Sequence, residues 1–238
     1  MMLNNHLGLM LSLQHSDSFF PSGATAFSWG LESLNRDKII SDTKSVSHYI
    51  ETQLLHRWVS FDQAIISAAW YASQTIEHRS NSNLMKIFEI DAFAEAMTLS
   101  ESVRTGSRRL GQTLMTVHVK LGTPSAIKLH AHIVANANTH YPHLAVTQGY
   151  LWAKLGVSEL ESRAISAHTL CTSATSAALR LGLIGHIDAQ RILMHMHTQI
   201  VKALDLPAPA LSNISSSTLA VDIGNLRHEA LDARMFAN

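Results

Sequence analysis

The chain has 238 residues, 46% hydrophobic and 15% charged, which is enough apolar material for a sizeable core and excludes disorder by composition. Lysine plus arginine and aspartate plus glutamate each number 18, so bulk charge gives no support to binding of nucleic acid or an anionic membrane. The single cysteine, Cys171, excludes an intrachain disulfide or a multi-cysteine zinc site, and this fits a reducing cytoplasm.

The N-terminal segment carries an apolar patch from Leu7 to Leu13 with no lysine or arginine before it. A secretory signal has a basic start, so we expect none here. No uninterrupted apolar run approaches the ~18 residues of a membrane span. We therefore expect a cytoplasmic protein without a membrane-embedded segment.

Residues 16–32 are rich in aromatic residues, proline and glycine but hold only two ionisable groups. Pro21 fixes its own φ and biases Phe20 towards an extended conformation. Gly23 and Gly30 can adopt backbone shapes or close contacts that other residues resist. The pattern predicts a rigid turn that runs into a short helix.

Helical periodicity continues through most of the chain, while alternating strand patterns and Asn-Gly or Asp-Gly hairpin turns are missing. We predict an all-α fold, a single-domain bundle of about nine to ten helices with a C-terminal amphipathic tail. The expected helices lie near residues 24–35, 44–58, 61–77, 84–98, 99–121, 124–138, 144–155, 159–182 and 188–205.

Local signals predict where several helices begin and end. Four expected starts are the capping boxes Ser60 to Gln63 and Ser158 to Glu161, the dipeptide Thr123-Pro124, and Asp188. Three expected stops are Gly122, Gly156 and Gly182.

One face of the helix expected over 159–182 consists mainly of small residues at spacings of three and four: Ala164, Ala167, Cys171, Ala174, Ala178 and Leu181. Small side chains let a neighbouring helix approach closely, so we predict that this is the central helix of the bundle. Cys171 is then a small buried hydrophobe rather than a nucleophile.

The composition of the chain changes near its C-terminus. Pro207 and Pro209 cannot continue a regular helix, and a polar, serine-rich run follows at 213–218. We predict a helical domain over 1–205, and a linker with a partner-binding tail over 206–238.

Fifteen histidines suggest metal binding, and three pairs are close in sequence: His130 and His132, His140 and His143, His195 and His197. A spacing of two on a helix separates side chains by about 200°, so the first and third pairs cannot readily share one ion. The second pair lies in an expected loop without a carboxylate close in sequence. We predict no dedicated metal site.

Sequence motifs for phosphate binding, dinucleotide binding, zinc-dependent hydrolysis or a serine nucleophile are missing. Glu95 and Glu101 are six residues apart, which does not place them on one helical face. No acid, base and nucleophile assemble from the pattern. We predict no catalytic residue and no enzymatic activity.

Residues 101–111 contain three arginines and Gly106 within a helical pattern. Glycine there costs about 1 kcal/mol relative to alanine, so we expect a packing or contact reason for it. The arginines form either a solvated face or a protein interface, and the low charge of the chain also favours some surface covered by another protein.

Four segments, in order, resemble the urease accessory protein UreF family: residues 11–32, 101–111, 145–190 and 222–236. The first holds Leu13-Gln14, Pro21-Ser22-Gly23 and Ser28-Trp29-Gly30-Leu31-Glu32, similar to the opening patterns of that family. The last holds Arg227-His228-Glu229 and Arg234-Met235-Phe236, similar to its C-terminal tail. The set spans nearly the whole chain.

The resemblance implies an all-helical, non-catalytic homodimer that has no resident cofactor and acts as a nickel-insertion chaperone scaffold. It would bridge UreD (also called UreH) and the GTPase UreG to deliver nickel to apo-urease, with modulation of the GTPase as a secondary role. Nucleic acid and membrane are not implied partners. Two alternatives stay open: a small helical ligand-binding protein or enzyme, and a histidine-based nickel metallochaperone.

The resemblance also implies partner-binding residues near both ends of the chain. They are Arg227, His228, Glu229, Arg234 and Phe236 of the tail, Pro21, Gly23, Gly30 and Glu32 of the N-terminal segment, and Arg104. Arg234 is the best single candidate for recruiting the GTPase, because a guanidinium can make forked contacts to carboxylates.

Overall fold

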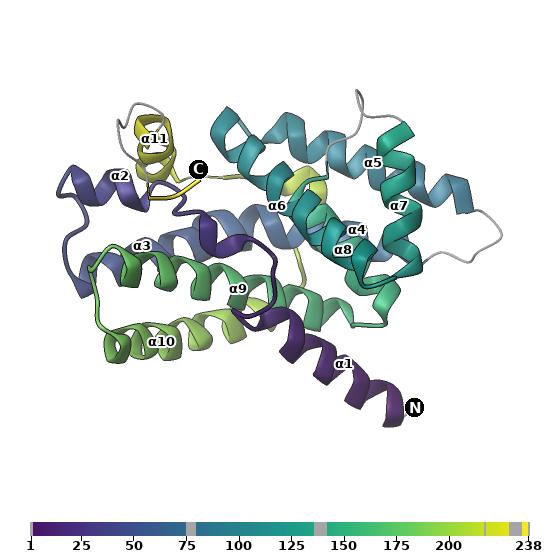
Figure 1. The fold of residues 1–238 in the computed structure, drawn as a ribbon, viewed down its shortest axis with the longest axis horizontal. Coiled ribbons are helices and arrows are strands. Elements are labelled where there is room, and N and C mark those ends of the chain that lie inside the picture. Colours follow the sequence, from purple (N-terminus) through teal and green to yellow (C-terminus); the bar gives the residue numbers. More distant parts are fainter. Residues whose placement is uncertain (1, 75–79, 136–141, 217, 229–234, 238) are drawn as a thin grey trace.

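The computed structural model describes residues 2–74, 80–135, 142–216, 218–228 and 235–237, which form an all-α structure without a strand (Figure 1). The fold class is therefore as predicted. The elements are α1 (Met2–Ser16), η1 (Ala24–Ala26), α2 (Leu31–Arg36), α3 (Thr43–Gln53), η2 (Leu54–Asp62), α4 (Gln63–Ser73), α5 (Ser80–Met97), α6 (Glu101–Lys120), α7 (Pro124–Ala135), α8 (Leu144–Leu155), α9 (Glu159–Arg180), α10 (His186–Leu204), η4 (Leu211–Asn213) and α11 (Leu219–His228).

The N-terminal helix α1 was not predicted, because its sequence showed only an apolar patch. It contacts α9 and projects away from the body of the protein (Figure 1). Leu7, Leu9, Met10 and Leu13 of this helix each expose more than half of their surface.

The single helix predicted over 24–35 is wrong. A 3₁₀ turn, η1, and the short helix α2 occupy the segment instead. Between them Trp29 (φ 51°) and Gly30 (φ 87°) adopt left-handed backbone conformations, which an α-helix cannot contain.

The predicted boundary near Ser60 is also wrong, because helix continues without interruption from α3 through η2 into α4. The middle part, η2, is a nine-residue π-helix. Ser60 does not cap a helix there. Its hydroxyl lies within hydrogen-bond distance of the carbonyl oxygens of His56 (3.1 Å) and Ser215 (2.7 Å), so it ties the C-terminal segment to the helix.

Most other helix-end predictions are confirmed. Ser158 and Glu161 form a reciprocal capping box at the start of α9, and α7 begins at Pro124. The three glycines at the expected stops have φ values of 76°, 83° and 71°. Asp188 is the exception: α10 begins at His186, and Asp188 lies in its first turn and accepts a hydrogen bond from Arg191 (3.0 Å).

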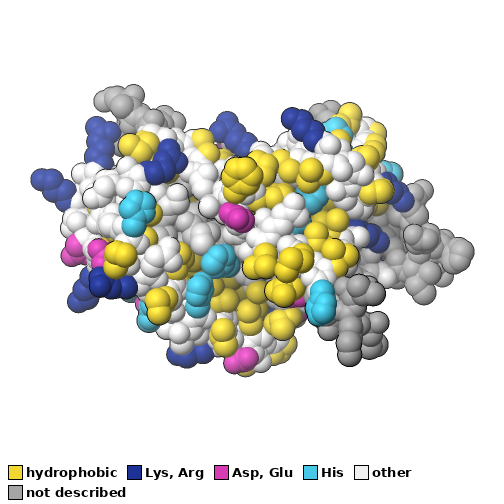
Figure 2. Space-filling view, turned by 60° about the horizontal axis from the view of Figure 1, so that its bottom comes forward, with side chains coloured by type: hydrophobic (Ala, Val, Ile, Leu, Met, Phe, Trp, Pro, Cys, Tyr) yellow, Lys and Arg dark blue, Asp and Glu magenta, His cyan; other side chains and the backbone are white. Residues whose placement is uncertain are grey.

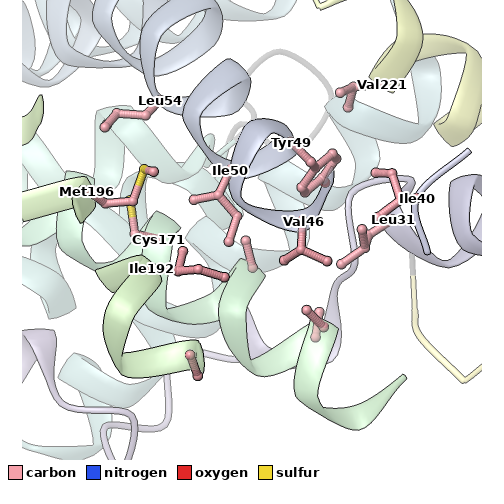
Figure 3. Close-up of a cluster of buried hydrophobic side chains, with 14 of the residues drawn as sticks. Leu31, Ile40, Val46, Tyr49, Ile50, Leu54, Cys171, Ile192, Met196 and Val221 are labelled. Carbon is pink, nitrogen blue, oxygen red and sulfur yellow. The ribbon is translucent and has the colours of Figure 1, made fainter. Parts of the chain in front are cut away.

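Helix α9 runs through the centre of the bundle and packs against α10, α1, α4, α8 and α3, as its small-residue face predicted (Figure 1). Ala167, Cys171 and Ala178 are fully buried in one core cluster with side chains of α3 and α10 (Figure 3). Burial raises the pKa of the Cys171 thiol to about 12, so Cys171 is an inert core residue.

A second core cluster joins α4, α5, α6, α7 and α8. Helices α4 and α8 cross within this cluster, and Gly149 lies at their point of contact. A Cβ atom at this position would lie 2.3 Å from the carbonyl oxygen of Ile66, so the crossing requires glycine.

After α10 the chain passes Pro207 and Pro209 and reaches α11, which packs on α2 (Figure 1). The division of the chain at residue 206 stays a prediction. Within the described residues, the structure holds no helix whose length and hydropathy suit a membrane crossing.

Candidate functional site

The N-terminal segment and the C-terminal helix, which lie some 190 residues apart in sequence, meet backbone to backbone. A Cβ atom at Gly30 would lie 2.9 Å from the amide nitrogen of Asn225. A Cβ atom at Gly224 would lie 3.0 Å from the carbonyl oxygen of Gly30. Two glycines therefore allow α11 to sit directly on the segment that precedes α2.

Glu32 holds the described end of the chain, residues 235–237. Its carboxylate accepts hydrogen bonds from the backbone amides of Met235 (2.8 Å) and Phe236 (3.3 Å). The amide of Ala237 donates to the carbonyl of Ala26 (2.8 Å). The two ends thus form one surface.

Arg180 of α9 fixes the aromatic ring of this segment. Its guanidinium lies 4.3 Å from the ring centroid of Phe236 and donates to the carbonyl of Thr25 (2.6 Å). The ring is buried, with 4% of its surface exposed. Phe236 therefore packs on its own chain, and a partner could reach it only after the segment moves.

Arg227 lies at the edge of this surface. It forms an ion pair with Asp37, yet 58% of its side chain is exposed, so its guanidinium is accessible to a partner. Glu229, Arg234 and the side chain of His228 lie outside the described residues.

Pro21 and Gly23 lie earlier in the N-terminal segment. Pro21 is exposed, and Gly23 (φ 80°) precedes η1, where it faces Leu110 and Thr113 of α6. The rings of Phe27 and Trp29 stack with centroids 5.3 Å apart.

Close packing explains why Gly106 lies inside helix α6, as expected from the sequence. A Cβ atom there would lie 3.0 Å from the Trp29 ring and 3.2 Å from the Phe27 ring. Glycine therefore lets the aromatic segment lie directly on α6.

Arg104 fixes the junction of α5 and α6. It contacts Glu101 (2.5 Å) and Glu95 (3.4 Å), and it donates to the carbonyls of Thr98 (2.6 Å) and Leu99 (3.0 Å), which lie between α5 and α6. A partner that binds Arg104 would have to compete with these contacts.

His143 forms a buried network that the sequence did not reveal. Its Nε2 lies 2.8 Å from a Glu95 carboxylate oxygen, and its Nδ1 lies 3.1 Å from the Ser107 hydroxyl. Burial lowers the pKa of His143, and the contact with Glu95 only partly opposes this. Glu95 is 48 residues away in sequence, so local spacing carried no signal for the pair. The network joins α5, α6 and the start of α8.

A pocket of about 120 Å³ lies between η2, α6, α8, α9 and α11. Arg57 and Asp62, both of the π-helix, form an ion pair (3.3 Å) in its wall. Gln53 Nε2 and Asn225 Oδ1 are buried in the same wall without a hydrogen-bond partner among the described residues. Burial raises the pKa of Asp222, which also lines the pocket. No pattern in the sequence indicated this polar interior.

The family model of UreF matches residues 40–197, which is more than half of the chain. The chain belongs to the UreF family. This confirms the resemblance drawn from the four sequence segments.

Proteins named urease accessory protein UreF are similar over nearly the full length of the chain. One from Trichodesmium erythraeum is 26% identical over 239 residues and covers 100% of both chains. One from Photorhabdus laumondii is 29% identical over 241 residues, covering 98% of this chain and 100% of the relative. One from Haemophilus influenzae is 23% identical over 231 residues, covering 97% and 94%. The two ends that form the surface around Glu32 lie outside the residues that the family model matches but inside the alignment with the Trichodesmium erythraeum protein, which covers the whole chain.

The UreF-family fold also presents an apolar face. Figure 2 shows hydrophobic side chains spread over the side where α1 and α10 lie, with few acidic groups among them. Exposed apolar residues of α10 include Ile187 (66% exposed), Met194 (70%) and Val201 (58%). Such a face is typical of a surface that another protein covers.

Proposed function

We propose that this protein is a non-enzymatic scaffold for urease maturation. It would bridge UreD/UreH and the GTPase UreG and so promote delivery of nickel to apo-urease, with nickel as cargo. Modulation of the GTPase is a secondary part of the proposal. The observation that carries it is membership of a family whose members are named urease accessory proteins.

The joined ends of the chain support a docking role. The segment 235–237 is held by a few hydrogen bonds and one buried ring, and Arg227 is accessible beside it. Segments with few contacts open at low free-energy cost, which suits a tail that rearranges on a partner.

The apolar surface of α1 and α10 supports a protein that works while covered by others. We propose that the protein forms a homodimer and acts in the cytoplasm. The projecting helix α1, with four half-exposed apolar side chains, would be costly to leave in water.

Reconstitution with purified UreD/UreH and UreG tests the scaffold proposal. We expect one larger species by size exclusion with light scattering, and faster nickel-dependent activation of apo-urease. Three separate peaks at micromolar concentrations would overturn the proposal. Comparing the full chain with a truncation after Leu206 measures the part played by the tail.

The central pocket favours one second candidate, the binding of a small polar molecule. The two unpartnered amide atoms of Gln53 and Asn225 could donate to and accept from such a ligand. Mass spectrometry of the molecules released on denaturing the purified protein tests it. A compound at one per chain supports ligand binding, whereas release of no stoichiometric compound argues against it.

A further inference from the structure

Two histidines from different helices face each other on the surface of the protein. His168 of α9 and His197 of α10 bring Nδ1 and Nε2 to within 3.3 Å. Their ring centroids are 5.3 Å apart and the rings are tilted by 32°. The two nitrogens therefore face each other directly.

This separation suits a shared metal ion. Two imidazole nitrogens that bind zinc at about 2.0–2.1 Å with a tetrahedral angle lie about 3.3 Å apart. Imidazole is a preferred ligand of the later first-row divalent ions. Conversion of the hydrogen bond into a chelate requires loss of the bridging proton and a turn of about 35° by each ring, so that both lone pairs point at the ion.

The helices hold both rings in place. Ala167 and Cys171 of α9, and Met196 of α10, are fully buried around the pair, so the two backbones are fixed by the core. His168 is half-buried, whereas His197 is exposed. Burial and the facing His197 lower the pKa of His168.

His195 and His197 are close in sequence, but their spacing of two on a helix argued against a shared metal ion. The structure agrees, because His195 lies near Glu51 of α3, with Nε2 and Oε1 3.6 Å apart. His168 is 29 residues from His197, so only the packing of α9 against α10 brings them together. In the described part of the chain no group of three or more potential ligands occurs, so the pair would leave coordination positions open.

We propose that His168 and His197 form an open, two-histidine surface site for a divalent first-row transition ion such as Zn²⁺. Water or a group from another molecule would fill the remaining positions. The proposal does not depend on the scaffold function.

Titration of the untagged full-length protein with ZnCl₂ by calorimetry tests the site. We expect a saturable step of one ion per chain, weakened about tenfold or more in both His168→Gln and His197→Gln. The matched control is His195→Gln, which removes an exposed histidine two residues away and should leave the step unchanged. An unchanged step in either pair variant, loss of the step in His195→Gln, or no saturable step in the wild type would each overturn the proposal.

Thermal unfolding gives a second measurement that separates binding from misfolding. A ligand that binds only the native state raises Tm by an amount that grows with the logarithm of 1 + [L]/Kd. Zinc should raise the Tm of the wild type and of His195→Gln but not of the two pair variants, whose metal-free Tm values should stay near the wild-type value. An equal zinc-induced shift in all four proteins would contradict the assignment.

Discussion

His15 of α1 and His118 of α6 meet inside the protein with their Nε2 atoms 3.1 Å apart and their rings stacked at 8°. His15 Nδ1 lies 2.7 Å from the carbonyl of Leu11 and can only donate to it, so its Nε2 is the acceptor in the neutral ring. His118 must then donate through Nε2, and its Nδ1 accepts from the Thr123 hydroxyl (3.2 Å). The Nε2–Nε2 hydrogen bond fails once both rings are protonated, because neither nitrogen can then accept, and burial disfavours a charge on either ring.

Acid should therefore weaken the fold through this pair. Burial lowers the pKa of His118 from 6.5 to about 4 and also lowers that of His15. Between pH 6.5 and 4 the unfolded chain binds more protons than the folded chain. The stabilisation of the fold by the neutral ring is therefore complete above pH 6.5 and is lost as the pH falls towards 4. For His118 this stabilisation is roughly 3 kcal/mol. Urea unfolding at a series of pH values measures it.

Two variants test whether this pair causes the acid effect: His118→Gln is the test and His6→Gln is its control. His118→Gln removes the most strongly shifted group and should flatten the pH dependence between 6.5 and 4. His6 is exposed, so His6→Gln should retain the wild-type slope. Identical slopes in all three proteins would show that the pair does not couple to folding.

Gly149→Ala should destabilise the protein by about 1–3 kcal/mol or more, because its methyl group would lie 2.3 Å from the Ile66 carbonyl oxygen and force α4 and α8 apart. The matched control is Gly185→Ala, at a position with φ −88° whose nearest neighbouring atom is 3.9 Å away. Equilibrium unfolding in urea compares the two. Equal stability of both variants would mean that the helix crossing is looser than described.

Phe236→Ala should release the C-terminal segment, because it removes the ring under Arg180 and the burial that holds residues 235–237. If the free energy that holds this segment falls by about 1–2 kcal/mol, the population of molecules with the segment detached rises roughly 5–30-fold. Limited proteolysis should cut the tail faster by a similar factor while the body stays intact. Phe19→Ala is the control, because the Phe19 side chain is 93% exposed. Cleavage rates that match in the two variants would contradict the docking of the segment.

Arg227→Ala and Asp37→Ala break the same ion pair. Together they separate the role of Arg227 within the chain from a role in binding a partner. The pair is exposed, so each variant should lose less than about 1 kcal/mol of stability. If Arg227 contacts a partner, Arg227→Ala should weaken binding to UreD/UreH or UreG while Asp37→Ala leaves it unchanged or stronger. Equal weakening by both variants would assign the effect to the intrachain pair instead.

Helix ends set by local backbone chemistry could be predicted from the sequence. Glycine at the left-handed stops, the Ser158 capping box and proline at the start of α7 act within a few residues, so tertiary packing did not alter them. Ser60 shows the limit of such signals. Its capping spacing was present, yet packing kept the helix continuous through η2 and used the hydroxyl to hold Ser215.

The sequence by itself determined the helical class, most helix ends, the small-residue face of the central helix and membership of a family. Only the tertiary structure decided which distant groups meet. Glu32 with Phe236, His15 with His118 and His168 with His197 come from separate elements, and neither helical periodicity nor motif spacing relates residues across a bundle. Local sequence fixes backbone conformation over a few residues, whereas side-chain pairs across helices depend on how every intervening helix packs.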